Sequence, residues 1–227
     1  MPQYEILARP AASVVKMTLQ PGESMTCESG AMIAMSSEIT VETSARKRGA
    51  GGLKRALKRL VAGENFFLNH FVAGAPNQTL IIGPGLLGDI AHHPLTGGTL
   101  VVQGSSWMAS STDIDIDATW QGLGKAIFSG EGVFWVKCSG TGDLFLNSFG
   151  AIYTVDVDGE YVVDTGHIVA FEDTLQFRIA KAGKSLLGSL LGGEGLVCRF
   201  HGRGRLYCQS HNPPNFGKLL GPKLKTR

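Results

Sequence analysis

The sequence is poor in charged and aromatic residues, which make up 18% and 8% of its 227 residues. It contains no run of about 18 apolar residues, so no transmembrane helix is predicted. Lysine and arginine number 21 against 19 acidic residues. The net charge of +2 argues against a protein dominated by nucleic-acid electrostatics, although a local basic patch remains open. The 43% of apolar residues excludes disorder as the main state of the chain.

The four cysteines lack the CxxC spacing of zinc ribbons and thioredoxin-like proteins. Three of them, Cys27, Cys198 and Cys208, lie in apolar, strand-like stretches, so we expect buried thiols. The opening residues MPQYEILARP lack the basic and apolar regions of a secretory signal. They also lack the Arg- and Ser-rich composition of a transit peptide. These features predict a cytoplasmic protein.

Glycine is abundant, at 31 residues, and it marks an internal repeat. Three segments share a short apolar stretch, a Gly-Glu pair and a strand-like run. The pairs are Gly63-Glu64, Gly130-Glu131 and Gly193-Glu194. A second phrase precedes each pair and runs from one glycine through a strand to another glycine and then an alanine, at Ala34, Ala109 and Ala170. Two phrases in the same order predict three copies of one unit, at about 1–83, 84–146 and 147–212.

Local patterns favour β-structure within each unit. Residues 113–117 alternate between aspartate and isoleucine with the period of a strand. The glycine-containing segments 139–143 and 201–205 lie between apolar runs and predict hairpins. We expect a mainly β protein of three tandem, pseudo-threefold β-sandwich-like repeats with short helices between strands. The repeats form one compact domain over 1–212, and 213–227 form a basic C-terminal extension.

The repeated phrases resemble those of the altered-inheritance-of-mitochondria protein 24 family. The matching phrases are PGESMTCESGAMIAM (21–35), VVDTGHIVAFED (162–173) and the three Gly-Glu pairs. The resemblance extends to about residue 210. It implies a fold related to the tryptophan RNA-binding attenuator protein, built from three tandem β-sandwich-like units. It implies no catalytic residues, and it associates the mitochondrial members with inner-membrane organisation.

Several residues are candidates for a structural role in the repeat. The Gly-Glu glutamates either cap the turn that follows a short helix or form a symmetric site on the pseudo-threefold axis, and their recurrence favours capping. Asp164 and His167 flank Gly166 in a turn. A contact between this carboxylate and imidazole is favoured over a catalytic pair, because no nucleophile has a recognisable spacing.

Two further motifs have ordinary interpretations. Asp113, Asp115 and Asp117 share one strand face and could bind a hard cation, but a solvated face is favoured. Residues 83–88 match GxGxxG, but a short segment ending at Pro94 follows in place of a helix, so we predict a turn. No catalytic residue, cofactor site or metal site is predicted.

The segment 46–61 is the strongest candidate for an interaction surface. Its apolar residues recur with helical spacing, which predicts a basic amphipathic helix. The apolar stripe either packs on the core and leaves the charges solvated, or the helix lies on anionic lipid or a phosphate backbone. The candidate surface contains seven basic residues: Arg46, Lys47, Arg48, Lys54, Arg55, Lys58 and Arg59.

These features predict a non-enzymatic β scaffold that forms homo-oligomers and organises partner proteins, including in a membrane-adjacent assembly. The alternative is a binder of anionic lipid or nucleic acid that acts through 46–61. A third hypothesis is a ligand or enzyme site between repeats, near Asp164 and His167.

Overall fold

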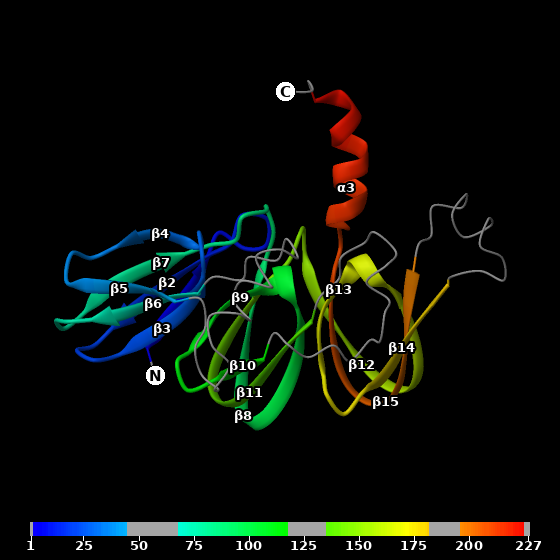
Figure 1. The fold of residues 1–227 in the computed structure, drawn as a ribbon, viewed down its shortest axis with the longest axis horizontal. Helices are drawn as coiled ribbons and strands as arrows, with labels where there is room; N and C mark the ends of the chain where they lie inside the picture. The colour runs from blue at the N-terminus through cyan, green and yellow to red at the C-terminus, as the bar shows by residue number, and fades with distance from the viewer. Residues whose placement is uncertain (1, 45–67, 118–134, 182–195, 225–227) are drawn as a thin grey trace, which may run out of the picture.

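Antiparallel β-structure dominates the computed structural model, which describes residues 2–44, 68–117, 135–181 and 196–224 (Figure 1). The expected mainly β class is therefore confirmed. The short helices predicted before the Gly-Glu pairs lie outside the described residues.

The strands follow one another in three successive groups along the chain. The first contains β1 (Gln3–Leu7), β2 (Val14–Leu19), β3 (Ser24–Glu28), β4 (Met32–Met35), β5 (Ile39–Ser44), β6 (Leu68–Ala73) and β7 (Gln78–Ile82). The second contains β8 (Ile90–Gln103), the 3-10 turn η1 (Gly104–Ser106), β9 (Trp107–Ser111), β10 (Asp115–Asp117) and β11 (Trp135–Asn147). The third contains β12 (Ile152–Asp164), the 3-10 turn η3 (Thr165–His167), β13 (Ile168–Glu172), β14 (Gln176–Lys181) and β15 (Leu196–Gln209).

The described strands form two sheets. A four-stranded sheet has the order β1-β2-β7-β4, and the larger sheet has the order β12-β15-β13-β8-β11-β9-β3-β6-β5. In the larger sheet, β10 also pairs with β11, and β14 also pairs with β15. The groups are joined where β9 pairs with β3 and where β13 pairs with β8. Strands of neighbouring groups therefore lie side by side in one sheet.

The long strands pass through glycine-rich centres without turning back. We expected hairpins at 139–143 and 201–205, but β11 and β15 run through both segments, so these predictions were wrong. Gly140 and Gly202 adopt φ values of +126° and +120°, which side chains rarely tolerate. Glycines in such conformations bend a strand and let it continue. The first part of β15 therefore pairs with β14, and its second part pairs with β13.

Three clusters of buried apolar side chains form the interior. The predicted alternation at 113–117 is confirmed, because Ile114 and Ile116 are buried while Asp113 and Asp115 are exposed. The third cluster contains Phe171, which packs edge-on against the rings of Trp135, Phe177 and Phe200.

The expected burial of the cysteines is also confirmed. Cys27, Cys198 and Cys208 are buried, as is Cys138, and none forms a disulfide. Burial raises the pKa of the Cys27 and Cys198 thiols to about 12 and that of Cys208 to about 11. These thiols are therefore protonated at neutral pH and serve as packing groups.

The C-terminal residues form a helix that projects from the β-structure (Figure 1). This helix, α3 (Pro213–Leu220), is capped by the side chain of Asn212, which accepts a hydrogen bond from the amide of Asn215 at 3.2 Å. A 3-10 turn, η4 (Gly221–Lys223), follows. Within the described residues, no helix has the length and apolar character needed to cross a bilayer.

Candidate functional site

The structure places only part of the predicted site residues. The basic segment 46–61 and the three Gly-Glu pairs lie outside the described residues, so their roles remain predictions. Among the described residues, no three His, Cys, Asp or Glu side chains form a group that could hold a metal ion. No helix follows residues 83–88, since β8 begins at Ile90, so the helix that a dinucleotide site needs is absent there.

Asp164, Gly166 and His167 form the turn at the end of β12. The Asp164 carboxylate accepts a hydrogen bond from the Gly166 amide at 2.8 Å and one from the Asn212 side chain at 3.2 Å. The Nδ1 atom of His167 donates to the carbonyl oxygen of Gln209 at 2.8 Å. Asp164 therefore bonds Gly166 in the turn and Asn212 outside it, while His167 bonds the end of β15, and these hydrogen bonds do not join Asp164 to His167. Their partners fix the backbone, which is a structural role.

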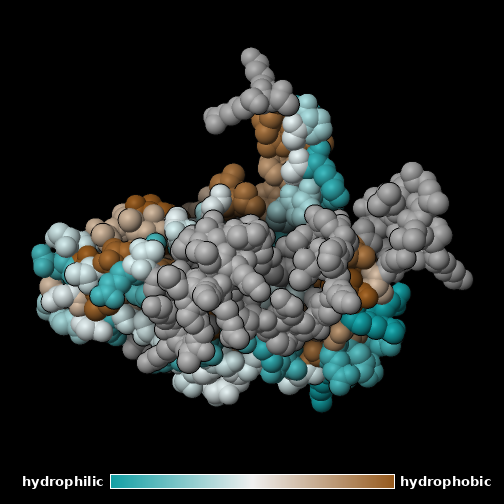
Figure 2. Space-filling view, viewed as in Figure 1, coloured by the Kyte–Doolittle hydropathy of each residue, from teal (hydrophilic) through white to brown (hydrophobic). Residues whose placement is uncertain are grey.

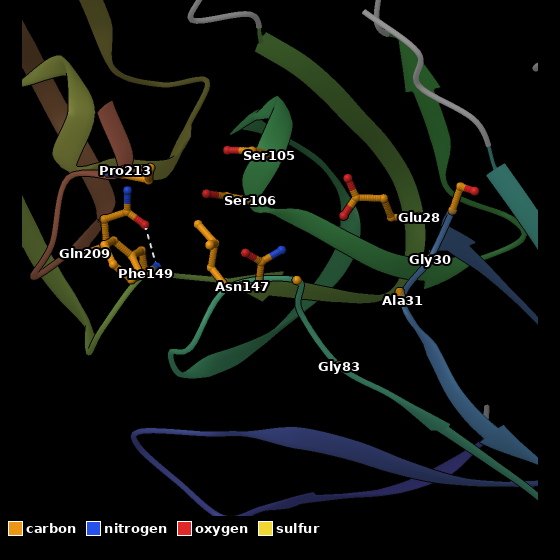
Figure 3. A pocket seen from close by; sticks show the side chains of 13 residues that line it. Glu28, Gly30, Ala31, Gly83, Ser105, Ser106, Asn147, Phe149, Gln209 and Pro213 are labelled. Carbon is orange, nitrogen blue, oxygen red and sulfur yellow. Dashed lines mark hydrogen bonds between the residues drawn. The ribbon is translucent and has the colours of Figure 1, made fainter. Parts of the chain in front are cut away.

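A candidate site is a cavity of about 330 Å³ where strand ends from all three groups converge (Figure 3). Glu28 enters from the end of β3, and Asn147 and Gln209 enter from the ends of β11 and β15. Other parts of the lining are Ser29, Gly30, Ala31, Gly83, Gly85, Leu86, Ser105, Ser106, Phe149 and Pro213. Neither Asp164 nor His167 is part of this lining, so the predicted site between repeats does not coincide with the cavity.

Glu28 is the titratable residue of this cavity. Burial raises the pKa of its carboxyl to about 7. Ser105, Ser106 and Gln209 have structural partners among the other polar side chains. The amide of Gln209 accepts from the Phe149 backbone N–H at 2.8 Å and donates to the Gly166 carbonyl at 2.9 Å. Glu28 thus changes its charge near neutral pH beside side chains that structural hydrogen bonds hold in place.

Two counterparts show why Glu28 is unusual. Glu28, Gln103 and Asp164 are each the last residue of a strand before a turn. The Gln103 side chain accepts hydrogen bonds from Ser105 and Ser106 at 2.6 and 3.3 Å, and Asp164 caps its own turn. The carboxylate of Glu28 instead faces the cavity (Figure 3). The sequence did not identify Glu28 as a site residue. Its one available signal was its position between two glycines in one copy of the repeated phrase, which does not distinguish it from other residues of that phrase.

The cavity can bind a small polar group by hydrogen bonding, with Glu28 as a pH-dependent acceptor or donor. Two of its three serines, Ser105 and Ser106, donate to the side chain of Gln103, which acts as an acceptor and cannot serve as a general base. Its lining, as the described residues form it, contains no histidine, cysteine or cationic side chain. The arrangement therefore favours binding over nucleophilic chemistry.

Another polar cluster attaches the first strand to the second group. The Tyr4 hydroxyl lies 2.8 Å from Nδ1 of His92, and Nε2 of that ring lies 2.7 Å from the Asp143 carboxylate. Burial, and then the charge of Asp143, raise the pKa of Tyr4, so its hydroxyl is a donor. Both contacts are satisfied when Nδ1 accepts from the Tyr4 hydroxyl and Nε2 donates to the Asp143 carboxylate. This network holds β1 against β8 and β11.

An ion pair fixes the segment that follows β1. The Arg9 guanidinium donates to both carboxylate oxygens of Asp89 at 2.9 and 2.8 Å. The Ser13 hydroxyl and the Ile90 amide also donate to this carboxylate, at 2.9 and 2.8 Å. Burial opposes ionisation, but these four hydrogen bonds together hold the pKa of Asp89 below its usual value. Asp89 therefore stays charged and orders the start of β8.

Comparison with known proteins identifies the relatives of this chain. The family model described as mitochondrial biogenesis AIM24 matches residues 4–211. An uncharacterized protein of Streptococcus pyogenes serotype M6 is 28% identical over 218 residues, covering 94% of this chain and 87% of that protein. The X-ray crystal structure of a Streptococcus pyogenes protein matches with a TM-score of 0.81 and 26% identity, covering 99% of this chain and 100% of that one. The chain therefore belongs to the AIM24 family, as its repeated phrases indicated.

Proposed function

We propose that this chain is a non-enzymatic β scaffold that self-associates and organises partner proteins. The supporting observation is the location of many of its exposed apolar side chains on two strands and one helix. These are Met32, Ile33 and Met35 on β4, Tyr153, Tyr161 and Val162 on β12, and Phe216, Leu219 and Leu220 on α3. The other exposed large apolar residues that the structure describes lie elsewhere: Tyr4, Val41, Leu86, Leu87 and Leu224. Exposed apolar patches are typical of interaction sites.

The proposed scaffold consists of three copies of one unit in an attenuator-like arrangement. In support, β4 pairs with β7, β9 with β11 and β13 with β15, each in antiparallel register. Each pairing skips one residue immediately before an alanine of the repeated phrase. The skipped residues are Ile33, Met108 and Val169, which precede Ala34, Ala109 and Ala170.

The helix α3 supports a role in attaching partners or a membrane-adjacent assembly. Leu219 is 65% exposed, and Phe216 lies on the same face three residues earlier. Figure 2 shows apolar side chains along this helix. The ring of Phe149 packs against Phe216 at a centroid distance of 5.2 Å and anchors the base of the helix. We also propose a cytoplasmic location, supported by the four cysteines without disulfides.

A crosslinked pull-down from the native cell tests the scaffold role. The full chain is compared with a Leu219→Glu variant, which places a charge on the exposed face of α3. We expect specific partners to crosslink to the wild-type chain and to be lost from the variant. Recovery of no specific partner by the wild-type chain would contradict the proposal, and equal recovery by both proteins would exclude α3 as the attachment surface.

A second candidate function is binding of anionic lipid or nucleic acid through 46–61, supported by the seven basic residues in this segment. The test compares anionic vesicles and single-stranded RNA at increasing salt. Binding through phosphate contacts must weaken steeply with salt, because counterions are released. Reversal of Lys54, Arg55, Lys58 and Arg59 to glutamate must then abolish it, and unchanged binding would reject the segment as the binding surface.

A further inference from the structure

Two strand edges lie unpaired at the ends of the described sheets. Within the described residues, β4 pairs with β7 alone, and residues 160–164 of β12 pair with β15 alone. Figure 1 shows these two strands toward opposite ends of the long axis. Both edges carry apolar side chains, and an exposed apolar edge is a template for pairing with another strand.

The chain itself contains two junctions between edges of this kind. At the first, β9 pairs antiparallel with β3 and places Ala109 opposite Cys27. At the second, β13 pairs antiparallel with β8 and places Ala170 opposite Val102. In both junctions, the third residue of the later strand faces the second-last residue of the earlier strand. One rule of register therefore describes both.

The same rule applied to the two open edges specifies a third junction. The third residue of β4 is Ala34, and the second-last residue of β12 is Val163. Antiparallel pairing then places Met35 opposite Val162. β4 also shares an irregularity with β9 and β13. In the pairing of β4 with β7 the second residue, Ile33, is skipped, just as the second residues of β9 and β13 are skipped in their own pairings.

Side chains at the open edges of β4 and β12 are far more exposed than the corresponding side chains at the two junctions. Val101, at the occupied edge of β8, is 1% exposed, whereas the corresponding Val162 of β12 is 46% exposed. Met108 and Val169, in strands with neighbours on both sides, are both 0% exposed, whereas the corresponding Ile33 of β4 is 57% exposed. A strand added to each open edge would bring these side chains to the burial of their counterparts.

The open edges of the terminal strands β1 and β5 are less suited to pairing. Among the large apolar residues of β1 and β5, Tyr4 and Val41 are the exposed ones, at 40% and 41%. Tyr4 is held by the hydrogen bond to His92 described above. Val41 is isolated on its strand, so it offers a control for the two proposed edges.

We propose that β4 of one molecule pairs antiparallel with residues 161–164 of β12 in a second copy, with Met35 opposite Val162. This inference rests on the self-association in the proposed function and gives it an interface. Because two different edges meet, the contact is heterologous and generates a closed ring or an open filament.

Light scattering of the full chain over a dilution series tests the interface. We expect the wild-type chain to form oligomers. Met35→Glu and Val162→Glu each place a charge on one edge and must both give the mass of a single chain. Val41→Glu, which adds the same charge to a similarly exposed site on β5, must leave the oligomer intact. Circular dichroism checks that every variant is folded.

Mixing the two glutamate variants tests the heterologous arrangement. Met35→Glu keeps an intact β12 edge, and Val162→Glu keeps an intact β4 edge. An equimolar mixture must therefore form a two-molecule complex. The assembly must stop at two molecules, because pairing of the free β4 edge with the free β12 edge would place two glutamates opposite each other. A mixture that stays monomeric, or assembly that survives in either variant alone, overturns the proposed pairing.

A crosslinking variant keeps the test decisive if a glutamate variant fails to fold. Under oxidation, Met35→Cys with Val162→Cys must give a ladder of disulfide-linked chains. Met35→Cys with Val163→Cys, whose second side chain points to the other face, must give none. If the two double-cysteine variants give disulfide-linked chains to the same extent, the proposed register of β4 against β12 is wrong. Wild-type oligomers without the expected crosslink overturn this interface alone, whereas a wild-type chain that stays monomeric at every concentration overturns the proposed self-association as well.

Discussion

Glu28 should make the protein less stable as pH rises from acid to neutral. Its carboxyl has a pKa of about 7 in the folded chain, against roughly 4.3 for an unfolded glutamate. Well below pH 4 the Glu28 carboxyl is protonated in both the folded and the unfolded chain, so it does not lower the free energy of unfolding there. Between about pH 4 and pH 7 the unfolded chain releases its proton while the folded chain keeps it, which favours unfolding. Above about pH 7 the loss is complete.

The size of the loss follows from the change in proton affinity. Each tenfold change in proton binding is worth about 1.4 kcal/mol, so ionisation of Glu28 in its site costs on the order of 4 kcal/mol before screening by water. The side chain keeps some exposure, and screening by water reduces this to about 2 kcal/mol. Glu28→Gln cannot ionise, so it should become more stable than the wild-type chain by about this amount on going from pH 4 to pH 8.

Urea unfolding across this pH range measures the difference. Glu38→Gln, at an exposed glutamate, is the matched control and should follow the wild-type curve. The reasoning fails if the stability curves of wild type and Glu28→Gln stay parallel from pH 4 to pH 8. That result would mean that the cavity hydrates the carboxylate fully.

Three further substitutions test the packing and electrostatics. Asp89→Asn should cost about 2 kcal/mol at pH 7, because it removes the charge of a buried carboxylate from its pair with the half-exposed Arg9 guanidinium. The wild-type advantage should fade as pH drops below about 4 through the lowered pKa of Asp89, and urea midpoints that do not change with pH would refute this. Gly88→Ala should lower the thermal midpoint, since its Cβ would collide with the Ser148 carbonyl, while Gly98→Ala, with open space, should change it little. Phe171→Ala should cost about 3–5 kcal/mol in urea unfolding, and a loss below about 1 kcal/mol would contradict the described aromatic packing.

The sequence was informative where side-chain periodicity alone decides the outcome. The alternation at 113–117 and the apolar surroundings of Cys27, Cys198 and Cys208 predicted burial correctly, because each depends on a single strand with one buried face. The three alanines of the repeated phrase were also recognisable, and each follows a skipped residue in its ladder.

The sequence was misleading where a residue has two conformational uses. Glycine at 140 and 202 suits a turn or a bend within a strand, and the choice depends on pairing with distant strands. Glu28 could not be identified as a site residue, because its pKa depends on burial by groups from other strands. The open edges of β4 and β12 were hidden for a similar reason, since an unpaired edge is defined by which strands are missing beside it.

The placement of β9 and β13 between strands of neighbouring groups has a consequence for synthesis on the ribosome. Because β9 begins 79 residues after the end of β3, β3 leaves the exit tunnel before β9 does, and the edge of β3 has to wait for its neighbour. β13 likewise begins 65 residues after the end of β8, so the edge of β8 also waits. The sheet edge of each group is therefore completed by a strand of the next group. A chain that stalls before β9 or β13 is made would expose an unpaired strand edge that chaperones and other nascent chains can bind.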